Sequence, residues 1–255
     1  MYLSGVRTDY QWERKMSDKS VLNELIQLNR EAIMRFCHGV KLHGEIAQVI
    51  EFDLMPKQHA WISRGGLISY DDRIQWQLKI PGGASKSIGR ALSGEGLSLT
   101  YVTAPTGGKI RVTANETGKL ATWDLRNGPI TCTSGAFVAA VGDVDINVTA
   151  ARSAGAAFFG GAGLFLQHLS GTGVVVIHGA GDFIEHQLGA GEKLLVSTGN
   201  LAVFSSKTQY DIRSVGGCLK MLFGGEGIFM TEMTGPGWVM LQSLKRQPKY
   251  KSKYQ

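Results

Sequence analysis

The sequence has few cysteines and no cysteine motif. Only 3 of the 255 residues are Cys, namely Cys37, Cys132 and Cys218, and no C-x-x-C spacing occurs. This excludes a disulfide framework and a cysteine-based zinc site. Free thiols are typical of a reducing compartment, so we expect a cytoplasmic protein.

Long apolar runs are also missing. The longest candidate, Ala154–Leu166, is broken by glycines and falls short of the ~20 residues of a spanning helix. The first fifteen residues contain no apolar core of the kind that a secretory signal needs. Their basic residues are interrupted by Asp9 and Glu13, which gives only weak support to a mitochondrial presequence. A mitochondrial location is therefore the alternative to the cytoplasm.

The net charge of +6 comes mainly from one end. The eleven residues 245–255 carry five basic groups and no acidic group, whereas residues 41–244 carry sixteen of each sign. A neutral body does not predict a nucleic-acid face. The basic tail is either a solvated terminus or a weak contact for anionic lipid or RNA.

What the chain does contain is glycine, 34 residues against 6 prolines, without a collagen period. From about residue 41, short β-rich runs alternate with glycine-bearing turns, which indicates antiparallel β structure. Before them, apolar residues at helical spacing predict one amphipathic helix over about 17–38. We therefore expect an N-terminal extension (1–40), a β domain (41–244) and a basic tail (245–255).

Related segments recur in the β domain. SGEGLSL, GGAGLFL and GGEGIFM begin at residues 93, 160 and 224, and each is followed by a strand, a turn and a second strand. A second kind of segment precedes each of them, from about residues 51, 118 and 181. This order predicts three pseudo-symmetric β-sandwich repeats. The glycine motifs are expected to shape repeat turns, at Gly94, Glu95, Gly96, Gly161, Gly163, Gly225, Glu226 and Gly227.

The arrangement of these segments suggests a closed body. An incomplete repeat stands at each end, so the two could pair with each other and remove exposed sheet edges. The specific expectation is that the strand within Gly44–Leu54 pairs with the C-terminal repeat.

On these motifs the chain resembles the family named for "altered inheritance of mitochondria 24". The resemblance covers about residues 44–244 and rests on AWISRGGLISYDD, ALSGEGLSLTYVTA, FFGGAGLFLQHLSGTGVVVIHGAG and GEKLLVSTGNLAVF, among others. It implies a fold similar to the tryptophan RNA-binding attenuation protein, with three β-sandwich units per chain. It also implies a link to membrane and respiratory-complex organisation, and no enzymatic activity or cofactor.

The sequence offers several candidate chemical sites. The glycine motifs lack the Lys and Ser/Thr of a phosphate-binding loop and lead into strands. His168, His178 and His186, with Asp182 and Glu185, could converge on a metal, although no familiar ligand spacing is present. No nucleophile motif is found. The sequence thus predicts no catalytic, cofactor or metal residues.

An apolar interaction surface remains. Phe158, Phe159, Phe229 and Trp238 lie near glycine turns, where aromatic side chains suit protein–protein contact. We expect a non-catalytic scaffold or assembly protein that forms a homo-oligomer, with weak membrane association and no nucleic-acid partner. The alternatives are a small-ligand or RNA-binding module and a metal-dependent enzyme on a β scaffold.

Overall fold

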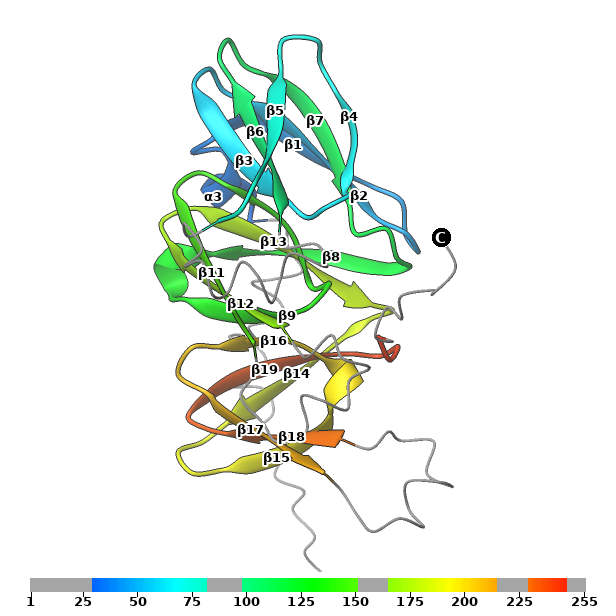
Figure 1. Cartoon of the computed structure of the whole chain (residues 1–255), viewed down its shortest axis with the longest axis vertical. Helices are drawn as coiled ribbons and strands as arrows, with labels where there is room; N and C mark the ends of the chain where they lie inside the picture. Colours follow the sequence, from blue (N-terminus) through cyan, green and yellow to red (C-terminus); the bar gives the residue numbers. More distant parts are fainter. Residues whose placement is uncertain (1–28, 82–97, 151–164, 215–228, 247–255) are drawn as a thin grey trace, which may run out of the picture.

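The computed structural model describes residues 29–81, 98–150, 165–214 and 229–246 (Figure 1). Within these ranges the chain consists mostly of strands in antiparallel sheets, with almost no helix. The all-β prediction is confirmed. The short helices of this part are α3 (Arg30–Ile33) and the 3₁₀ turns Leu125–Asn127 and Thr198–Asn200.

The strands form four sheets, which we number in chain order. Sheet 1 has the order β1-β2-β7-β4: Cys37–His43, Val49–Leu54, Gly108–Thr113, Leu67–Tyr70. Sheet 2 has the order β5-β6-β3-β10-β13-β8: Gln75–Lys79, Leu99–Ala104, Gln58–Ile62, Phe137–Val141, Val174–Ala180, Gly118–Asp124. Sheet 3 has the order β11-β12-β9-β16-β19-β14: Val144–Ala150, Phe165–Gly171, Ile130–Thr133, Leu201–Ser205, Gly237–Gln242, Phe183–Leu188. Sheet 4 has the order β15-β18-β17: Lys193–Ser197, Phe229–Thr234, Gln209–Ser214.

From β2 onwards, one order of strand pairing occurs three times. On one side, β7, β13 and β19 pair with β2, β8 and β14, respectively. On the other side, they pair with β4, β10 and β16, respectively. β3, β9 and β15 pair with β6, β12 and β18, as do β5, β11 and β17. Two further pairings, β3 with β10 and β9 with β16, join neighbouring sets. In the described residues, β4 and β15 therefore end their sheets.

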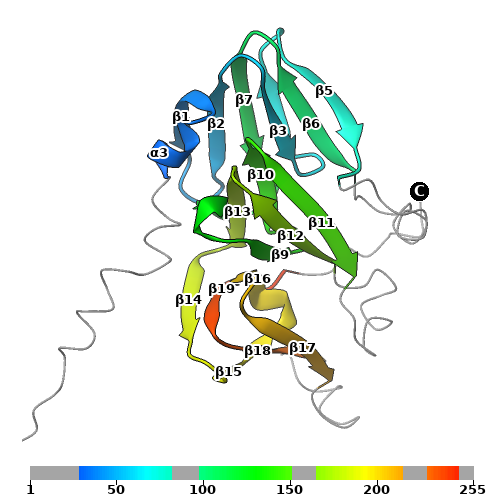
Figure 2. The same cartoon turned by 90° about the vertical axis from the view of Figure 1, so that its left-hand side faces the viewer.

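Three apolar cores connect the four sheets in a row, from the N-terminal strands at the top of Figure 1 to β14–β19 at the bottom. β13 is buried at every position, as is its neighbour β10, because this part of sheet 2 is covered on both faces. β7 alternates between buried and exposed positions because sheet 1 packs on one face alone. Figure 2 shows the same succession from the side.

Two expectations of the sequence are corrected. The helix predicted over 17–38 ends at Ile33 in the described part, since Cys37 already begins β1; residues 17–28 lie outside the described ranges. The strand within Gly44–Leu54 is β2, and it pairs with β1 and β7 rather than with the C-terminal strands. β1 takes the edge of β2, so the expected closure between the two chain ends does not form.

Candidate interaction surfaces

Exposed apolar side chains gather on β4 and β5. The described residues include ten large apolar side chains that are exposed, and five of them lie between residues 68 and 80. We call four of these the β4–β5 surface: Ile68, Tyr70, Trp76 and Leu78. Their exposed fractions lie between 46% and 55%. The Trp76 indole Nε1 donates a hydrogen bond to the Tyr70 hydroxyl (3.0 Å), which links sheet 1 to sheet 2 across this open side.

The other end of the molecule also carries an exposed apolar side chain on a terminal strand. Leu195, in the middle of β15, is 57% exposed. Its neighbour Lys193 forms an ion pair with Glu232 of β18 (2.9 Å), so the charged side chains of this face are engaged within sheet 4. β15 lies at the bottom of Figure 1 and β4 near the top.

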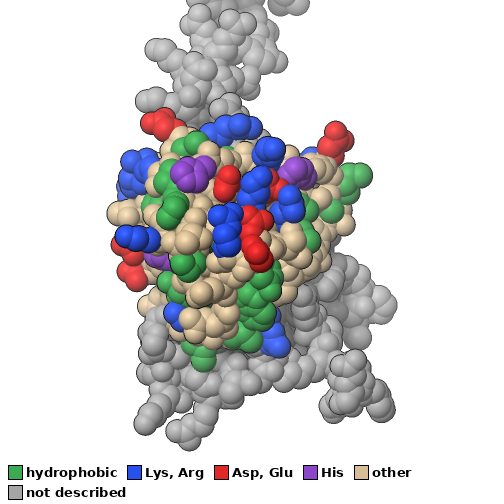
Figure 3. All heavy atoms as spheres, turned by 90° about the horizontal axis from the view of Figure 1, so that it is seen from above, with side chains coloured by type: hydrophobic (Ala, Val, Ile, Leu, Met, Phe, Trp, Pro, Cys, Tyr) green, Lys and Arg blue, Asp and Glu red, His purple; other side chains and the backbone are tan. Residues whose placement is uncertain are grey.

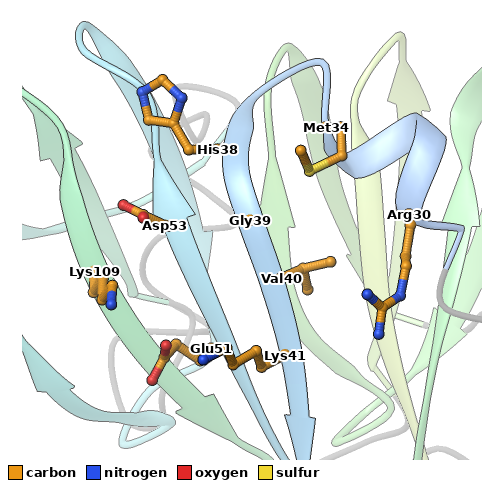
Figure 4. Close-up of a pocket in the computed structure, with 9 residues that line it drawn as sticks. All are labelled: Arg30, Met34, His38, Gly39, Val40, Lys41, Glu51, Asp53 and Lys109. Atoms are coloured by element: carbon orange, nitrogen blue, oxygen red, sulfur yellow. The ribbon is translucent and has the colours of Figure 1, made fainter.

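A pocket of about 500 Å³ opens on the outer face of sheet 1, beside α3 (Figure 4). Its lining includes Glu51 and Asp53 from β2, Lys41 from β1 and Lys109 from β7. The buried Glu51 carboxylate accepts from Arg111 (2.6 Å). Its charge is therefore already balanced by the protein.

Charges of both signs alternate on this end of the molecule. Figure 3 looks down on the end formed by the N-terminal strands, where Lys and Arg side chains lie next to Asp and Glu. In sheet 1, Lys41 lies opposite Glu51, and Glu51 lies opposite Arg111. These cross-strand pairs balance the negative charge of the buried Glu51.

A buried polar cluster joins β13 to the end of the described chain. His178 is 1% exposed, and its Nδ1 lies 2.7 Å from the Arg246 guanidinium. Arg246 also donates to Glu116 (3.0 Å). Burial first, and then the charge of Arg246, lower the pKa of His178 to about 4. The imidazole is therefore neutral at pH 7, with Nδ1 accepting from Arg246; within the described residues its Nε2 has no hydrogen-bond partner.

The histidines considered as metal ligands are not brought together. His178 is engaged with Arg246, whereas His168 contacts Thr131 (3.3 Å) and His186 lies on β14. Over residues 29–81, 98–150, 165–214 and 229–246, no three His, Cys, Asp or Glu residues are grouped so as to bind a metal.

The described thiols are buried. Burial raises the pKa of Cys37 to about 12 and raises that of Cys132 still further, so both remain protonated thiols at neutral pH. Neither is placed to act as a nucleophile. Cys218 lies outside the described residues.

The predicted glycine turns lie outside the described ranges. They are Gly94, Glu95, Gly96, Gly161, Gly163, Gly225, Glu226 and Gly227. Of the predicted surface residues, Phe158 and Phe159 also lie outside, and Phe229 begins β18, with its side chain not described. Trp238 is 7% exposed and its ring packs 5.0 Å from that of Trp123, so it belongs to the core.

Similarity to known proteins agrees with this architecture. The model of the family "mitochondrial biogenesis AIM24" matches residues 40–244. The chain belongs to this family. A crystal structure of a Streptococcus pyogenes protein has a TM-score of 0.69 with this AIM24-family chain at 22% identity, covering 81% of this chain and 94% of that one. At that identity the likeness shows the fold alone. No curated protein matches the sequence.

Two further findings bear on this AIM24-family member. None of the helices in the described part combines the length and the apolar character that crossing a bilayer requires. Of the exposed side chains of β4 and β5, Ile68, Tyr70 and Leu78 were missed from the sequence. The signal was available in ISY (68–70) and IQWQLKI (74–80), where apolar residues alternate with polar ones as in a strand with one apolar face.

Proposed function

We propose that this protein is a non-catalytic scaffold or assembly protein that works as a homo-oligomer. The observation that carries this proposal is the β4–β5 surface. Four large apolar side chains are exposed there, on β4 and β5. In the described part of the chain, each of these two strands ends its sheet. Exposed apolar patches and open sheet edges are both typical of protein–protein contact.

The chemistry of the described side chains supports a role without catalysis. Cys37 and Cys132 are buried thiols with raised pKa values, and His178 is buried and held by Arg246. An active nucleophile or general base needs access to substrate and a pKa suited to its task. No observation favours the RNA-binding or metal-dependent alternatives.

The biological setting of the proposal comes from the family. Its name refers to mitochondrial biogenesis. We therefore propose that the oligomer supports the organisation of a membrane or of respiratory complexes through protein contacts. The cytoplasm, expected from the cysteine content, is the proposed compartment, with the mitochondrion as the alternative.

Light scattering of the full chain tests the proposal. We expect a discrete oligomer at low and high salt, because its contacts are mainly apolar. Leu78→Glu should weaken association roughly tenfold or more, since a charge in an apolar contact is costly. Ile46→Glu is the matched control, because Ile46 is 73% exposed and lies between β1 and β2 rather than on β4 or β5. A full chain that stays monomeric at the highest soluble concentration would refute the proposal.

A further inference from the structure

We infer that β15 of one copy adds to the edge of β4 of a second copy, so that the chains associate head to tail. This inference rests on the proposed oligomer and names the surfaces that meet. It follows from how the chain covers the same kind of edge internally. β10 and β16 each pair on one side with a strand of the preceding set, β3 and β9 respectively. β4 is the strand at the corresponding place, and no set precedes it.

The correspondence of β4 with β10 and β16 rests on register. All three strands share an irregularity after their first residue where they pair with β7, β13 and β19. Aligning these irregularities makes Ile68 the counterpart of Val138 and Ala202. In the same way, Tyr70 becomes the counterpart of Ala140 and Phe204.

The side chains at these positions are exposed on β4 and buried on β10 and β16. Val138 and Ala202 are fully buried, whereas their counterpart Ile68 is 53% exposed. Tyr70 is 46% exposed, whereas Ala140 and Phe204 are buried. The internal strands are covered because a strand of the preceding set lies beside them. The exposed side chains of β4 are thus apolar residues at positions that the fold elsewhere buries.

β15 carries the matching half of such a junction. Trp61 of β3, Thr131 of β9 and Leu195 of β15 pair with Tyr101, His168 and Glu232. The partners Tyr101, His168 and Glu232 occupy the same place relative to the three glycine motifs: each lies seven residues after the second residue of its motif (Gly94, Gly161 and Gly225). Because their partners correspond, Leu195 is the counterpart of Trp61 and Thr131. Thr131 is buried beneath β16, and Leu195 is exposed because no strand follows it in sheet 4.

The β5 side chains extend the match. In the internal junction, Trp61 packs against the core that contains Ile146 of β11. Trp76 of β5 is the counterpart of Ile146, because Trp76 pairs with Val102 and Ile146 with Leu169. A second copy would place Leu195 where Trp61 lies, over Trp76. This packing buries apolar side chains from both ends at once.

The register follows from the two internal junctions. Trp61 lies opposite Ala140, and Thr131 lies opposite Phe204. By the same register, Leu195 of one copy lies opposite Tyr70 of the next. Because two different surfaces meet, the contact is heterologous and each copy keeps one free end for another copy.

Mixing two singly blocked chains tests the head-to-tail geometry. Tyr70→Glu blocks the β4 end and Leu195→Glu blocks the β15 end; both positions are exposed, so the fold should be retained. We expect each variant alone to be monomeric by light scattering. An equal mixture should form a complex of twice the 27.6 kDa chain mass and no larger species, because one intact β15 meets one intact β4.

Disulfide trapping tests the register in the same mixture design. With Cys218→Ser in every chain, Tyr70→Cys and Leu195→Cys chains should crosslink at least tenfold faster than Tyr70→Cys and Lys193→Cys chains, because residues 70 and 195 are predicted to lie opposite each other. Equal rates would overturn the register. A wild-type oligomer with blocked variants that still self-associate, or that fail to combine, would overturn the head-to-tail contact and leave the proposed oligomer standing. A monomeric wild type would remove both.

Discussion

Arg246 holds the end of the described chain against the middle of the molecule. Its guanidinium bridges His178 and Glu116, and its backbone N–H donates to Gly199 O (2.9 Å). The side chain is only 11% exposed, although it belongs to a segment that the sequence suggested to be a solvated tail. The run of basic residues in the sequence therefore did not reveal that Arg246 is largely buried and contacts His178 and Glu116.

Replacing Arg246 with Ala is expected to lower the free energy of unfolding by about 1–3 kcal/mol, because buried His178 loses its hydrogen-bond partner. Urea unfolding measures this. Arg73→Ala is the control: Arg73 is 57% exposed and pairs with Asp71 on the surface, so its loss should change stability by under ~1 kcal/mol. Equal effects of the two substitutions would mean that the buried cluster stabilises the fold no more than a surface ion pair does.

The His178 side chain is expected to make the fold sensitive to acid. Its pKa falls from 6.5 to about 4 in the folded chain, so the unfolded chain binds more protons between these values. Its contribution to stability is complete above pH 6.5 and is lost as pH falls towards 4. In urea unfolding, the free energy of unfolding should fall less between pH 7 and pH 5 for His178→Gln than for the wild-type chain. His38→Gln, at an exposed site, should behave as wild type; an unchanged pH slope in the His178 variant would contradict the expectation.

At the scale of elements, the turn between β10 and β11 needs glycine for two reasons. Gly142 has φ +82°, a left-handed conformation that other residues adopt at a cost, and a Cβ there would overlap the Phe36 ring. Phe36 follows α3, so this contact helps to seat α3 against sheet 2. Gly191, between β14 and β15, has a similar φ of +75° and open space around it.

We expect both Gly142→Ala and Gly191→Ala to lose about 1–2 kcal/mol from backbone strain. Gly142→Ala should lose ~1–3 kcal/mol more because the new methyl group meets the Phe36 ring. Thermal or urea unfolding of the two variants isolates the packing effect as their difference. A difference near zero would show that Phe36 moves aside without loss.

At the scale of the whole molecule, the row of sheets leaves its two ends less protected than its middle. The strands β10 and β13 of sheet 2 are covered on both faces, whereas β4, β5 and β15 carry exposed apolar residues. Hydrogen exchange should therefore be slow in β10 and β13 and faster in the end strands. On raising the protein concentration, β4, β5 and β15 should become protected together.

β17 is the internal control for that measurement. It is the other terminal strand of sheet 4 in the described residues, and the proposed contact does not involve it. Its exchange should depend little on concentration. Concentration-dependent protection of β17 without β15 would point to a different contact surface.

In the chain, the glycine-bearing segments, spaced by 67 and 64 residues, are followed in order by the strand pairs β6–β7, β12–β13 and β18–β19. Short β-rich runs bounded by glycine-bearing turns predicted the strands. The helix prediction failed at its end, because Cys37 and His38 belong to β1, where Cys37 is buried. Tertiary contact with β2 overrode local periodicity there.

By itself, the sequence determined the class of fold and the order of its β segments, because strand periodicity and glycine turns are local properties. The tertiary structure decided which strand edges are covered. Pairing between distant segments places β3 beside β10 and β9 beside β16, and leaves β4 and β15 at the ends of their sheets. It also decided that Trp238 is core and that Ile68 and Leu195 are surface, since burial depends on which sheet lies opposite and not on the side chain alone.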